Sequence, residues 1–291
     1  MIVTTGFFDG VHKGHRKVIE QLVRTAAENK DESRVVTFWP HPRTVLQNGA
    51  RDLRLLGSIS ERKAMLEALG VDNVEVVEFT KEFSRLPAVE YFRRYVGEGT
   101  VVLGYDNLVG CDCRTSADVV KAAGEAGLEV ITVDECPYGP EGLAISSTRI
   151  RKALEEGLIN DASAMLGYDY SLHGVVVAGN RMGRTIGFPT ANIQLYDPLK
   201  LIPGNGVYAV AVETLGRNHL GMCNIGVRPT VGPNNQRTIE TNIFDFGEDI
   251  YGLDIRISFL RKIRDEKPFS SLAALASQLS IDKEMCLKYQ R

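Results

Sequence analysis

The sequence predicts two domains, an α/β domain with a parallel sheet followed by a small antiparallel β-barrel that ends in a C-terminal helix. Three observations indicate this order. The chain has 291 residues, which is long for one domain and sufficient for two. Short apolar runs alternate with helical patterns in the first half. Near residue 170 the helical patterns give way to segments rich in β-branched and aromatic residues. We place the domains at 1–167 and 168–291.

Five apolar runs in the first half predict strands, and helical patterns separate them. The clearest helix covers 15–28, where Val18, Leu22 and Ala26 share one face at helical spacing, and a second covers 60–69. Strands that alternate with helices form βαβ units, whose strands pair in parallel and are covered on both faces. The predicted strands are 2–5, 34–38, 73–78, 100–103 and 128–133.

The second half opens with a helical pattern at 148–166 and continues as strands separated by Gly, Asn and Pro clusters. Ile255, Ile257 and Phe259 alternate with polar neighbours, as a half-buried strand requires. A last helix is predicted at 270–279. Strands of this kind, without long helices between them, favour a small antiparallel barrel that the last helix closes. They are predicted at 171–178, 206–213, 219–225, 238–244 and 254–260.

Composition limits the classes of partner and compartment. The formal net charge of −3 gives no reason to expect a nucleic-acid or anionic-membrane partner, because such partners usually require a basic surface. No apolar run approaches the length of a membrane span, and residues 1–6 lack the basic start of a signal peptide. Cys111 and Cys113 do not have the spacing of a CxxC redox or zinc pair. We therefore expect a cytoplasmic protein with reduced thiols, and we leave its oligomeric state open.

The string GFFDGVHKGH at 6–15 lies between the first predicted strand and the first predicted helix. In an open parallel sheet ligands bind at this turn, where the helix start directs unpaired N–H groups toward them. The three glycines of the string allow the backbone to approach a phosphate closely. His12 and His15 can both hydrogen-bond oxygen atoms whose charge rises during phosphoryl transfer. Two of the five histidines of the chain share this turn, so we favour a functional role over incidental polar side chains.

The residues HKGH at 12–15 match the HxGH signature of the nucleotidyltransferase superfamily. The longer string resembles the GNFDGVHxGH pattern of bacterial riboflavin kinase/FAD synthetases, with Phe7 in place of the usual Asn, where we expect no chemistry. TFWPHP at 37–42 and ISSTRIR at 145–151 resemble two further segments of this family. The resemblance implies a Rossmann-like nucleotidyltransferase domain that adenylylates FMN with ATP. It places on the nucleotide and its phosphates Gly6, Phe8, Asp9, Gly10, Gly14, Ser147, Thr148 and Arg151.

In this family the ISSTRIR motif closes over the ATP phosphates. Ser147 or Thr148 is also a suitable N-cap for the following helix, and one residue can do both. The two histidines of the HxGH signature would stabilise the charge that develops on the transferred adenylyl group and on the departing pyrophosphate. Asp9 and Asp106 would orient magnesium, nucleotide or flavin.

One segment departs from the family pattern. The family usually shows a sequence like GxDFRFG, which helps to hold the flavin, whereas 104–110 reads GYDNLVG. Asp106 remains as a candidate flavin contact, but the aromatic and basic residues do not. This favours an alternative in which the first domain only binds nucleotide and the chain is a riboflavin kinase alone. The intact HxGH and ISSTRIR motifs oppose it. Aminoacyl-tRNA synthetases share an HxGH-like turn, but this chain has no KMSKS-like string and no basic RNA-binding stretch.

The string GNRMGRTIGFPTAN at 179–192 is rich in glycine but contains no Walker A pattern. If Thr190 and Asn192 are extended, their side chains point to the same side, which suits a magnesium ion and a phosphate oxygen. From these residues alone a polar strand edge remains an equal alternative.

The resemblance favours a magnesium and phosphate site over a polar strand edge. GFPTAN at 187–192 is the hallmark of the riboflavin kinase barrel, and GVY at 206–208 and NIGVRPTVG at 224–232 match other motifs of that barrel. ETNIFDF at 240–246 matches its ExHxxDF strand, with Asn242 in place of the common His. This implies that the second domain phosphorylates riboflavin with ATP to FMN. It assigns Gly183, Thr190 and Asn192 to the nucleotide, the last two also to Mg²⁺, and Arg228 and Asn242 to the flavin.

Strand alternation supports Glu240 as a functional residue. Ile239, Thr241 and Ile243 should lie on one face of their strand, with Glu240 and Asn242 on the other. The functional hypothesis makes Glu240 the base that accepts the proton of the ribityl 5′-hydroxyl of riboflavin. A non-enzymatic flavin-binding protein, the second alternative, would not need Glu240, Thr190 and two histidines suited to phosphate chemistry. The choice between Mg²⁺ and Mn²⁺ stays open, because oxygen ligands suit both.

Overall fold

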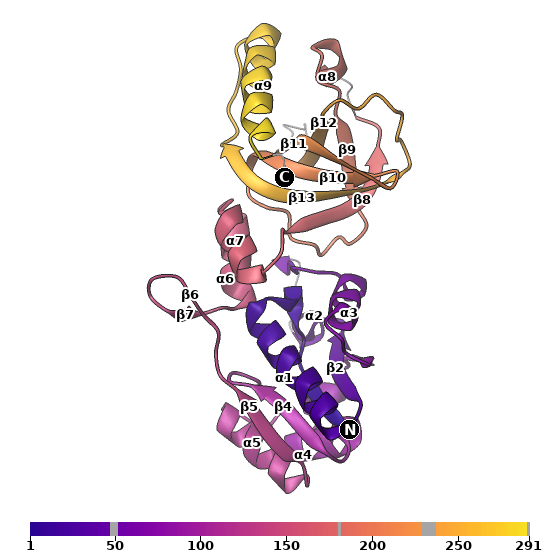
Figure 1. Ribbon diagram of the computed structural model, residues 1–291, viewed down its shortest axis with the longest axis vertical. Coiled ribbons are helices and arrows are strands. Elements are labelled where there is room, and N and C mark those ends of the chain that lie inside the picture. Colours follow the sequence, from indigo (N-terminus) through magenta and orange to yellow (C-terminus); the bar gives the residue numbers. More distant parts are fainter. Residues whose placement is uncertain (47–51, 180–181, 228–236, 290–291) are drawn as a thin grey trace. The chain divides into compact units, whose positions relative to one another are not determined.

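The computed structural model describes residues 1–46, 52–179, 182–227 and 237–289. The chain divides into two compact units, Met1–Ser147 and Thr148–Arg291, which are coloured indigo to magenta and rose to yellow in Figure 1. The first unit is an α/β structure and the second contains a closed barrel, so the predicted fold class is confirmed.

The first unit is built on a five-stranded parallel sheet with the order β3-β2-β1-β4-β5. The central strand β1 is buried along its whole length, as a strand covered on both faces must be. All five predicted strands are confirmed to within one residue at each end. They are β1 (Ile2–Thr5), β2 (Ser33–Trp39), β3 (Asn73–Glu78), β4 (Thr100–Gly104) and β5 (Glu129–Val133).

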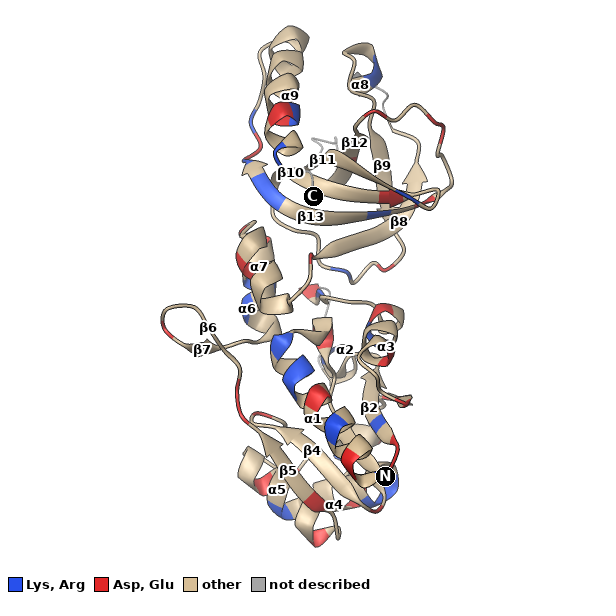
Figure 2. Ribbon diagram, in the orientation of Figure 1, with Lys and Arg blue, Asp and Glu red and all other residues tan. Residues whose placement is uncertain are grey.

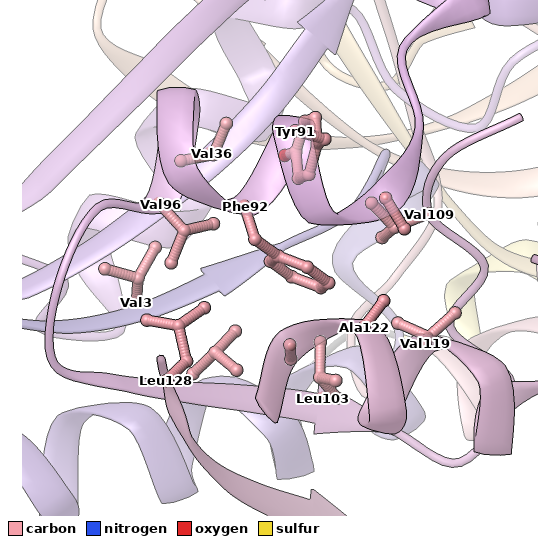
Figure 3. Packing of buried hydrophobic residues seen from close by; sticks show 13 residues of the cluster. Val3, Val36, Tyr91, Phe92, Val96, Leu103, Val109, Val119, Ala122 and Leu128 are labelled. Atoms are coloured by element: carbon pink, nitrogen blue, oxygen red, sulfur yellow. The ribbon is translucent and has the colours of Figure 1, made fainter. Parts of the chain in front are cut away.

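Successive residues of β1 enter different cores, one on each face of the sheet. Ile2 packs with Ile19 and Leu22 of α1, whereas Val3 packs with Phe92 on the other face (Figure 3). The helices of this unit are α1 (Lys13–Asn29), α2 (Pro42–Leu46), α3 (Ile59–Ala68), α4 (Ala88–Tyr91) and α5 (Ser116–Glu125), and the short strands β6 (Pro137–Tyr138) and β7 (Leu143–Ala144) pair with each other. Both α3 and α5 begin with a capping box, which satisfies the first N–H groups of each helix.

The second unit contains a closed barrel with the strand order β10-β11-β12-β9-β8-β13. All neighbouring strands are antiparallel. The strands are β8 (Ser171–Val177), β9 (Ala191–Leu195), β10 (Gly206–Thr214), β11 (Arg217–Val227), β12 (Arg237–Ile243) and β13 (Asp254–Arg264). Five of the six were predicted, and the sixth, β9, contains Asn192 of the GFPTAN motif. The helices are α6 (Ser147–Glu155), α7 (Ile159–Leu166), α8 (Met182–Thr185) and α9 (Leu272–Leu287).

The prediction of one continuous helix over 148–166 is wrong, because α6 and α7 are separated at Gly157. The φ angle of Gly157 is 74°, which a helix does not allow, and a Cβ there would lie 2.7 Å from the Lys262 side chain. The sequence pattern continues across the break because both helices bury apolar side chains, among them Ile150, Leu154 and Ala162.

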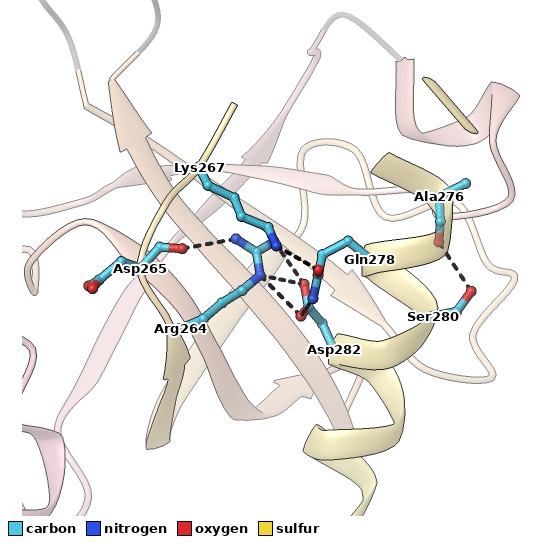
Figure 4. Close-up of polar contacts among 7 residues, drawn as sticks. All are labelled: Arg264, Asp265, Lys267, Ala276, Gln278, Ser280 and Asp282. Carbon is cyan, nitrogen blue, oxygen red and sulfur yellow. Dashed lines mark hydrogen bonds and ion pairs between the residues drawn. The ribbon is translucent and has the colours of Figure 1, made fainter. Parts of the chain in front are cut away.

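The last helix is longer than the predicted 270–279, because α9 continues to Leu287. The continuation contains Asp282, a charged residue that interrupts the apolar pattern but is fully buried. Figure 4 shows why this is tolerated: Arg264 at the end of β13 donates from Nε and Nη2 to the Asp282 carboxylate at 2.8 to 3.1 Å, and Gln278 Nε2 donates to it at 2.8 Å. A paired buried charge therefore attaches α9 to the barrel.

Charged side chains of both signs are interspersed along the helices, as Figure 2 shows for α1 and α3. This distribution agrees with the small net charge. Within the described ranges, the chain contains no helix with the length and apolar character needed to span a membrane.

Candidate functional sites

The carboxyl edge of the parallel sheet carries a cavity of about 690 Å³. From β1 the chain proceeds to β2 on one side, and from β4 it proceeds to β5 on the other, so the order reverses between the adjacent strands β1 and β4. Such a reversal leaves a crevice in which open α/β sheets bind ligands. Segments that follow β1, β2, β4 and β5 all contribute to the cavity wall.

Many of the predicted nucleotide and flavin residues meet in this one cavity. Those that line it are Gly6, Phe8, His12, Gly14, His15, Asp106 and Ser147. Asp9 and Gly10 do not line it, and Thr148 and Arg151 follow on α6 in the second unit. Residues separated by more than 130 positions in the sequence are thus gathered at the end of β1.

His12 and His15 lie against each other at the start of α1. Nδ1 of His12 accepts a hydrogen bond from the backbone N–H of His15 at 3.3 Å, so His12 is the N-cap of the helix. The two imidazole rings are stacked, with centroids 3.6 Å apart and an angle of 17° between their planes. Gly14 makes room for this arrangement, because a Cβ there would lie 3.2 Å from two atoms of the His12 ring.

The surroundings keep His15 neutral. Its pKa is lowered well below the ordinary value of 6.5, first by desolvation and then by the charges of His12 and Arg62. Nδ1 of His15 is buried and has no hydrogen-bond partner among the described residues. A neutral imidazole that faces a cavity can donate one hydrogen bond and accept another, which suits contact with phosphate oxygens.

Asp9 stabilises the turn after β1, although it does not itself line the cavity. It is buried, and its carboxylate accepts hydrogen bonds from the N–H groups of Leu56, at 2.9 and 3.1 Å, and Gly57, at 3.3 Å. Its backbone carbonyl accepts a hydrogen bond from Ser147 Oγ at 3.1 Å. Asp9 therefore links the turn after β1 to the segment before α3 and to the ISSTRIR motif.

In the barrel, the register between two strands brings the predicted kinase residues together. Glu240 on β12 is the direct partner of Asn192 on β9. Thr190, just before β9, places its Oγ1 3.5 Å from Glu240 Oε2. Thr190 also lines a cavity of about 330 Å³, to which Thr241 and Phe246 contribute. The Thr190 hydroxyl, the Asn192 amide and the Glu240 carboxylate thus lie close together where β9 pairs with β12.

The remaining predicted kinase residues lie around this cluster. Asn242 is buried, and its Nδ2 donates to the carbonyl of Pro189 at 2.6 Å, within the GFPTAN motif. Gly183 allows a tight turn, because a Cβ there would lie 2.2 Å from the Phe188 carbonyl oxygen. As predicted for an alternating strand, Ile239, Thr241 and Ile243 are buried. Arg228 lies outside the described residues.

Comparison with protein families divides the chain as the two sites do. The FAD synthetase family matches residues 1–149, and the riboflavin kinase family matches residues 166–290. The bifunctional riboflavin kinase/FMN adenylyltransferase of Listeria monocytogenes serovar 1/2a is 36% identical over 97% of this chain and 90% of its own length. The protein of the same name from Bacillus subtilis is 34% identical over 99% of this chain and 92% of its own. The chain belongs to this bifunctional family.

A solved structure also matches the whole chain. It is described as a macrolide-efflux protein from Streptococcus pneumoniae, is 34% identical, and superimposes with a TM-score of 0.92 over 99% of this chain and 94% of its own. Both domains of the bifunctional family are therefore present, and the alternative of a flavin carrier without enzymatic domains loses its support.

The departure from the family pattern at 104–110 is accommodated locally. Asn107 Nδ2 donates to the carbonyl of Thr5 at 2.6 Å, which fixes the end of β1. Gly110 has a φ of 80°, and a Cβ there would lie 2.4 Å from the backbone nitrogen of Ala88. Leu108 is 61% exposed and lines the cavity. The segment presents an amide and an aliphatic side chain where the family pattern has aromatic and basic ones.

Sequence reasoning missed an aromatic wall of the cavity in the first unit. It consists of Phe38, Phe79, Phe83 and Tyr91, whose rings contact one another. The Tyr91 hydroxyl lies 2.5 Å from Thr5 Oγ1 at the end of β1. The wall offers apolar surface to a planar ring. Phe38 lies on β2, Phe79 and Phe83 follow β3, and Tyr91 lies on α4, so no local pattern could have grouped them. Of the four, only Phe38 lay in a motif that the sequence singled out.

Proposed function

We propose that each unit performs one of the two ATP-dependent reactions of its family, with the residues described above in defined roles. The chain is a bifunctional riboflavin kinase and FMN adenylyltransferase. It phosphorylates riboflavin to FMN and transfers the adenylyl group of a second ATP to FMN, which gives FAD and pyrophosphate. The observation that carries the assignment of roles is the gathering of seven predicted residues around one cavity at the sheet reversal.

In the first unit, His12 and His15 hydrogen-bond the phosphate oxygens of ATP. The stacked imidazoles of His12 and neutral His15 and the N–H groups at the start of α1 meet the charge that develops on the α-phosphate and on the leaving pyrophosphate. Gly6, Gly10 and Gly14 let the backbone approach the nucleotide. Ser147 supplies a hydroxyl at the cavity wall, and Thr148 and Arg151 of the same motif add a hydroxyl and a cation. Asp106 contacts the flavin.

In the barrel, Glu240 accepts the proton from the ribityl 5′-hydroxyl as it attacks the γ-phosphorus of ATP. Its pairing with Asn192 and the nearby Thr190 hydroxyl keep the carboxylate in position. Gly183 allows the nucleotide loop to turn tightly, and Asn242 and Arg228 contribute to flavin binding.

Magnesium is the metal that these residues fit. Thr190 Oγ1 and the Asn192 side-chain oxygen are hard oxygen ligands, which Mg²⁺ prefers together with water and phosphate oxygens. Softer metals prefer Cys or His ligands, and neither Thr190 nor Asn192 supplies one. When bound, Mg²⁺ would neutralise the charge of the terminal phosphates.

We also propose that the adenylyltransferase part spans 1–167 and the kinase part 168–291, because the ISSTRIR motif continues into α6 and the kinase family match begins at residue 166. All five cysteines are free thiols, which fits the reducing cytoplasm.

The direct experiment incubates the purified protein with riboflavin, ATP and Mg²⁺ and separates riboflavin, FMN and FAD by chromatography. We expect FMN to appear first and FAD to follow, and both to disappear when EDTA exceeds the metal. Replacement of Mg²⁺ by Mn²⁺ or Ca²⁺ tests the choice of metal. Formation of FMN without FAD, even with FMN supplied at high concentration, would contradict the role proposed for the first cavity. Undiminished turnover in excess EDTA would contradict the requirement for a metal ion.

A further inference from the structure

Arg62, on α3, is one of the most deeply buried side chains of the chain, with 1% of its surface exposed. Its Nη1 donates to Thr37 Oγ1 at 3.1 Å and to the carbonyl of Phe38 at 3.3 Å. Its guanidinium carbon lies 3.8 Å from the centroid of the Phe7 ring. An arginine in this position was not singled out by the sequence, because it occupies one of the polar positions of an otherwise ordinary helical pattern.

Among the residues that the structure describes, none forms an ion pair that compensates the charge of Arg62. Nε and Nη2 have no hydrogen-bond partner among the described residues. The acidic group whose charge acts on it is Asp9, but the carboxylate oxygens of Asp9 accept hydrogen bonds from the Leu56 and Gly57 amides. Burial lowers the pKa of Arg62 to about 10, and the charge of Asp9 opposes this only in part. Arg62 therefore stays positively charged at neutral pH. A buried charge with unpaired donors costs several kcal/mol, so its presence needs a reason.

The location of Arg62 supplies such a reason. Phe7, the ring on which it stacks, is in the turn after β1 and lines the same cavity as His12 and His15. The positive charge of Arg62 also acts on His15 and helps to lower its pKa. The other contact of the Phe7 ring is the edge-on ring of His41, with centroids 4.3 Å apart. Phe7 thus contacts the guanidinium and also forms part of the cavity wall, which Arg62 itself does not line.

We propose that Arg62 is a positioning residue for adenylylation, whose buried positive charge acts through the Phe7 ring to favour the polyphosphate of ATP at the turn after β1. A fixed charge in a site shielded from water acts more strongly than one at the surface and needs no reorganisation when the ligand arrives. The guanidinium draws the electrons of the Phe7 ring toward itself, which makes the rest of the ring less repulsive to an anion. The bound polyphosphate adds negative charge to that of Asp9, whose carboxylate already accepts hydrogen bonds from the Leu56 and Gly57 amides.

This inference revises the expectation for Phe7. At this position the sequence departs from the family pattern, and we expected no chemistry there. In the structure the ring contacts the guanidinium and lines the cavity. Phe7 and Arg62 act together, because an arginine without the ring would be open to the cavity and to water.

The test compares two variants that separate charge from hydrogen bonding. Arg62→Gln removes the charge but retains a donor for Thr37 and Phe38, whereas Arg62→Lys retains the charge and loses the planar stack. FAD formation is measured from FMN and ATP without riboflavin, so only the first cavity reacts. We expect Arg62→Gln to raise the KM for ATP about tenfold while kcat changes less than about threefold, and Arg62→Lys to keep the KM within about threefold.

Two results would overturn the proposal. One is an unchanged KM for ATP in Arg62→Gln, and the other is an equal rise of KM in Arg62→Lys, which would indicate packing instead of charge. FMN formation by the barrel of the same preparations measures the amount of intact protein. Should Arg62→Gln fail to fold, Arg62→Met replaces it as the variant without charge: a KM about tenfold above that of Arg62→Lys supports the role of charge, and an equal KM removes it.

The proposal rests on the role of the first cavity in adenylylation, and the two can fail separately. If the unaltered protein forms no FAD from FMN, the role of the cavity itself is wrong. If the unaltered protein forms FAD with saturable dependence on ATP but Arg62→Gln has the same KM, only the role of Arg62 is wrong.

Discussion

The barrel and the parallel-sheet unit assemble their polar sites by different means. In the barrel, Glu240 and Asn192 are partners across two paired strands, so their proximity follows from register. In the first unit, His12, Asp106 and Ser147 are distant in sequence and meet only because the sheet order reverses beside β1. A change in the barrel site should therefore act on one reaction through one side chain. A change in the first cavity can also act through the turn, the helix cap and the buried charge behind them.

The sharpest test of this contrast is Glu240→Gln. Loss of the carboxylate removes the proton acceptor while the strand pairing is kept, so riboflavin phosphorylation should fall by about 10²–10⁴, the usual effect of removing a general base. The measurement is FMN formed from riboflavin and ATP. FAD formation from supplied FMN is the control and should be unchanged. A variant with near-normal turnover would exclude Glu240 from this role.

A second test concerns the attachment of α9 to the barrel. Asp282→Asn leaves the Arg264 charge without its partner, and breaking a buried ion pair costs about 3–5 kcal/mol of the free energy of unfolding. Loss of FMN formation with increasing urea measures this, and Asp265→Asn is the matched control, because Asp265 is an exposed partner of Lys262. The single tryptophan, Trp39, lies in the first unit, so its fluorescence should report unchanged stability there. Equal effects of the two substitutions would contradict the importance of burial.

In the first unit, His12→Ala should lower FAD formation by about 10²–10³, the typical effect of losing one donor to a developing oxyanion. The substitution also removes the N-cap of α1 and the ring on which His15 stacks. FMN formation from riboflavin should be preserved, and both activities are measured on the same preparation. Equal loss of both would show that the two units do not act independently.

The smallest expected effect is a pH dependence of stability in the first unit. The folded-state pKa of His15 is lowered, so below about pH 6.5 the unfolded chain binds a proton that the folded protein does not. Stability should therefore fall as pH decreases from 7 to 5.5, by about 1 kcal/mol from this residue. Urea unfolding followed by Trp39 fluorescence measures it. His15→Gln should reduce the dependence, whereas His173→Gln, a change in the barrel, should not. A dependence that is identical in all three proteins would assign it to other groups.

The sequence predicted most of the fold because the strands of both units carry uninterrupted local signals. It missed the length of α9 because Asp282 looks like a solvent-facing residue until Arg264, from another element, is placed beside it. The break between α6 and α7 was missed because Gly157 alone does not reveal a positive φ.

For the sites, motifs located the histidines, Thr190 and Glu240, because their neighbours in sequence are also their neighbours in space. Arg62 and the aromatic wall have no such signal. Their relation to the cavity depends on tertiary packing between α3, the loops and the strand ends.

Gly14 gives the HxGH motif a meaning beyond phosphate approach. A Cβ at this position would lie 3.2 Å from both Nδ1 and Cε1 of His12, so a residue larger than glycine at 14 crowds an imidazole at 12. Positions 12 and 14 of the motif therefore pack as one unit, and a substitution at one of them limits which residues fit at the other. In a library that randomises 12–15 and selects for folded protein alone, Ala or Ser should be recovered at 14 mainly in clones that carry a smaller residue at 12. Selection for FAD formation should instead restore the pair of His12 and Gly14 at the same time.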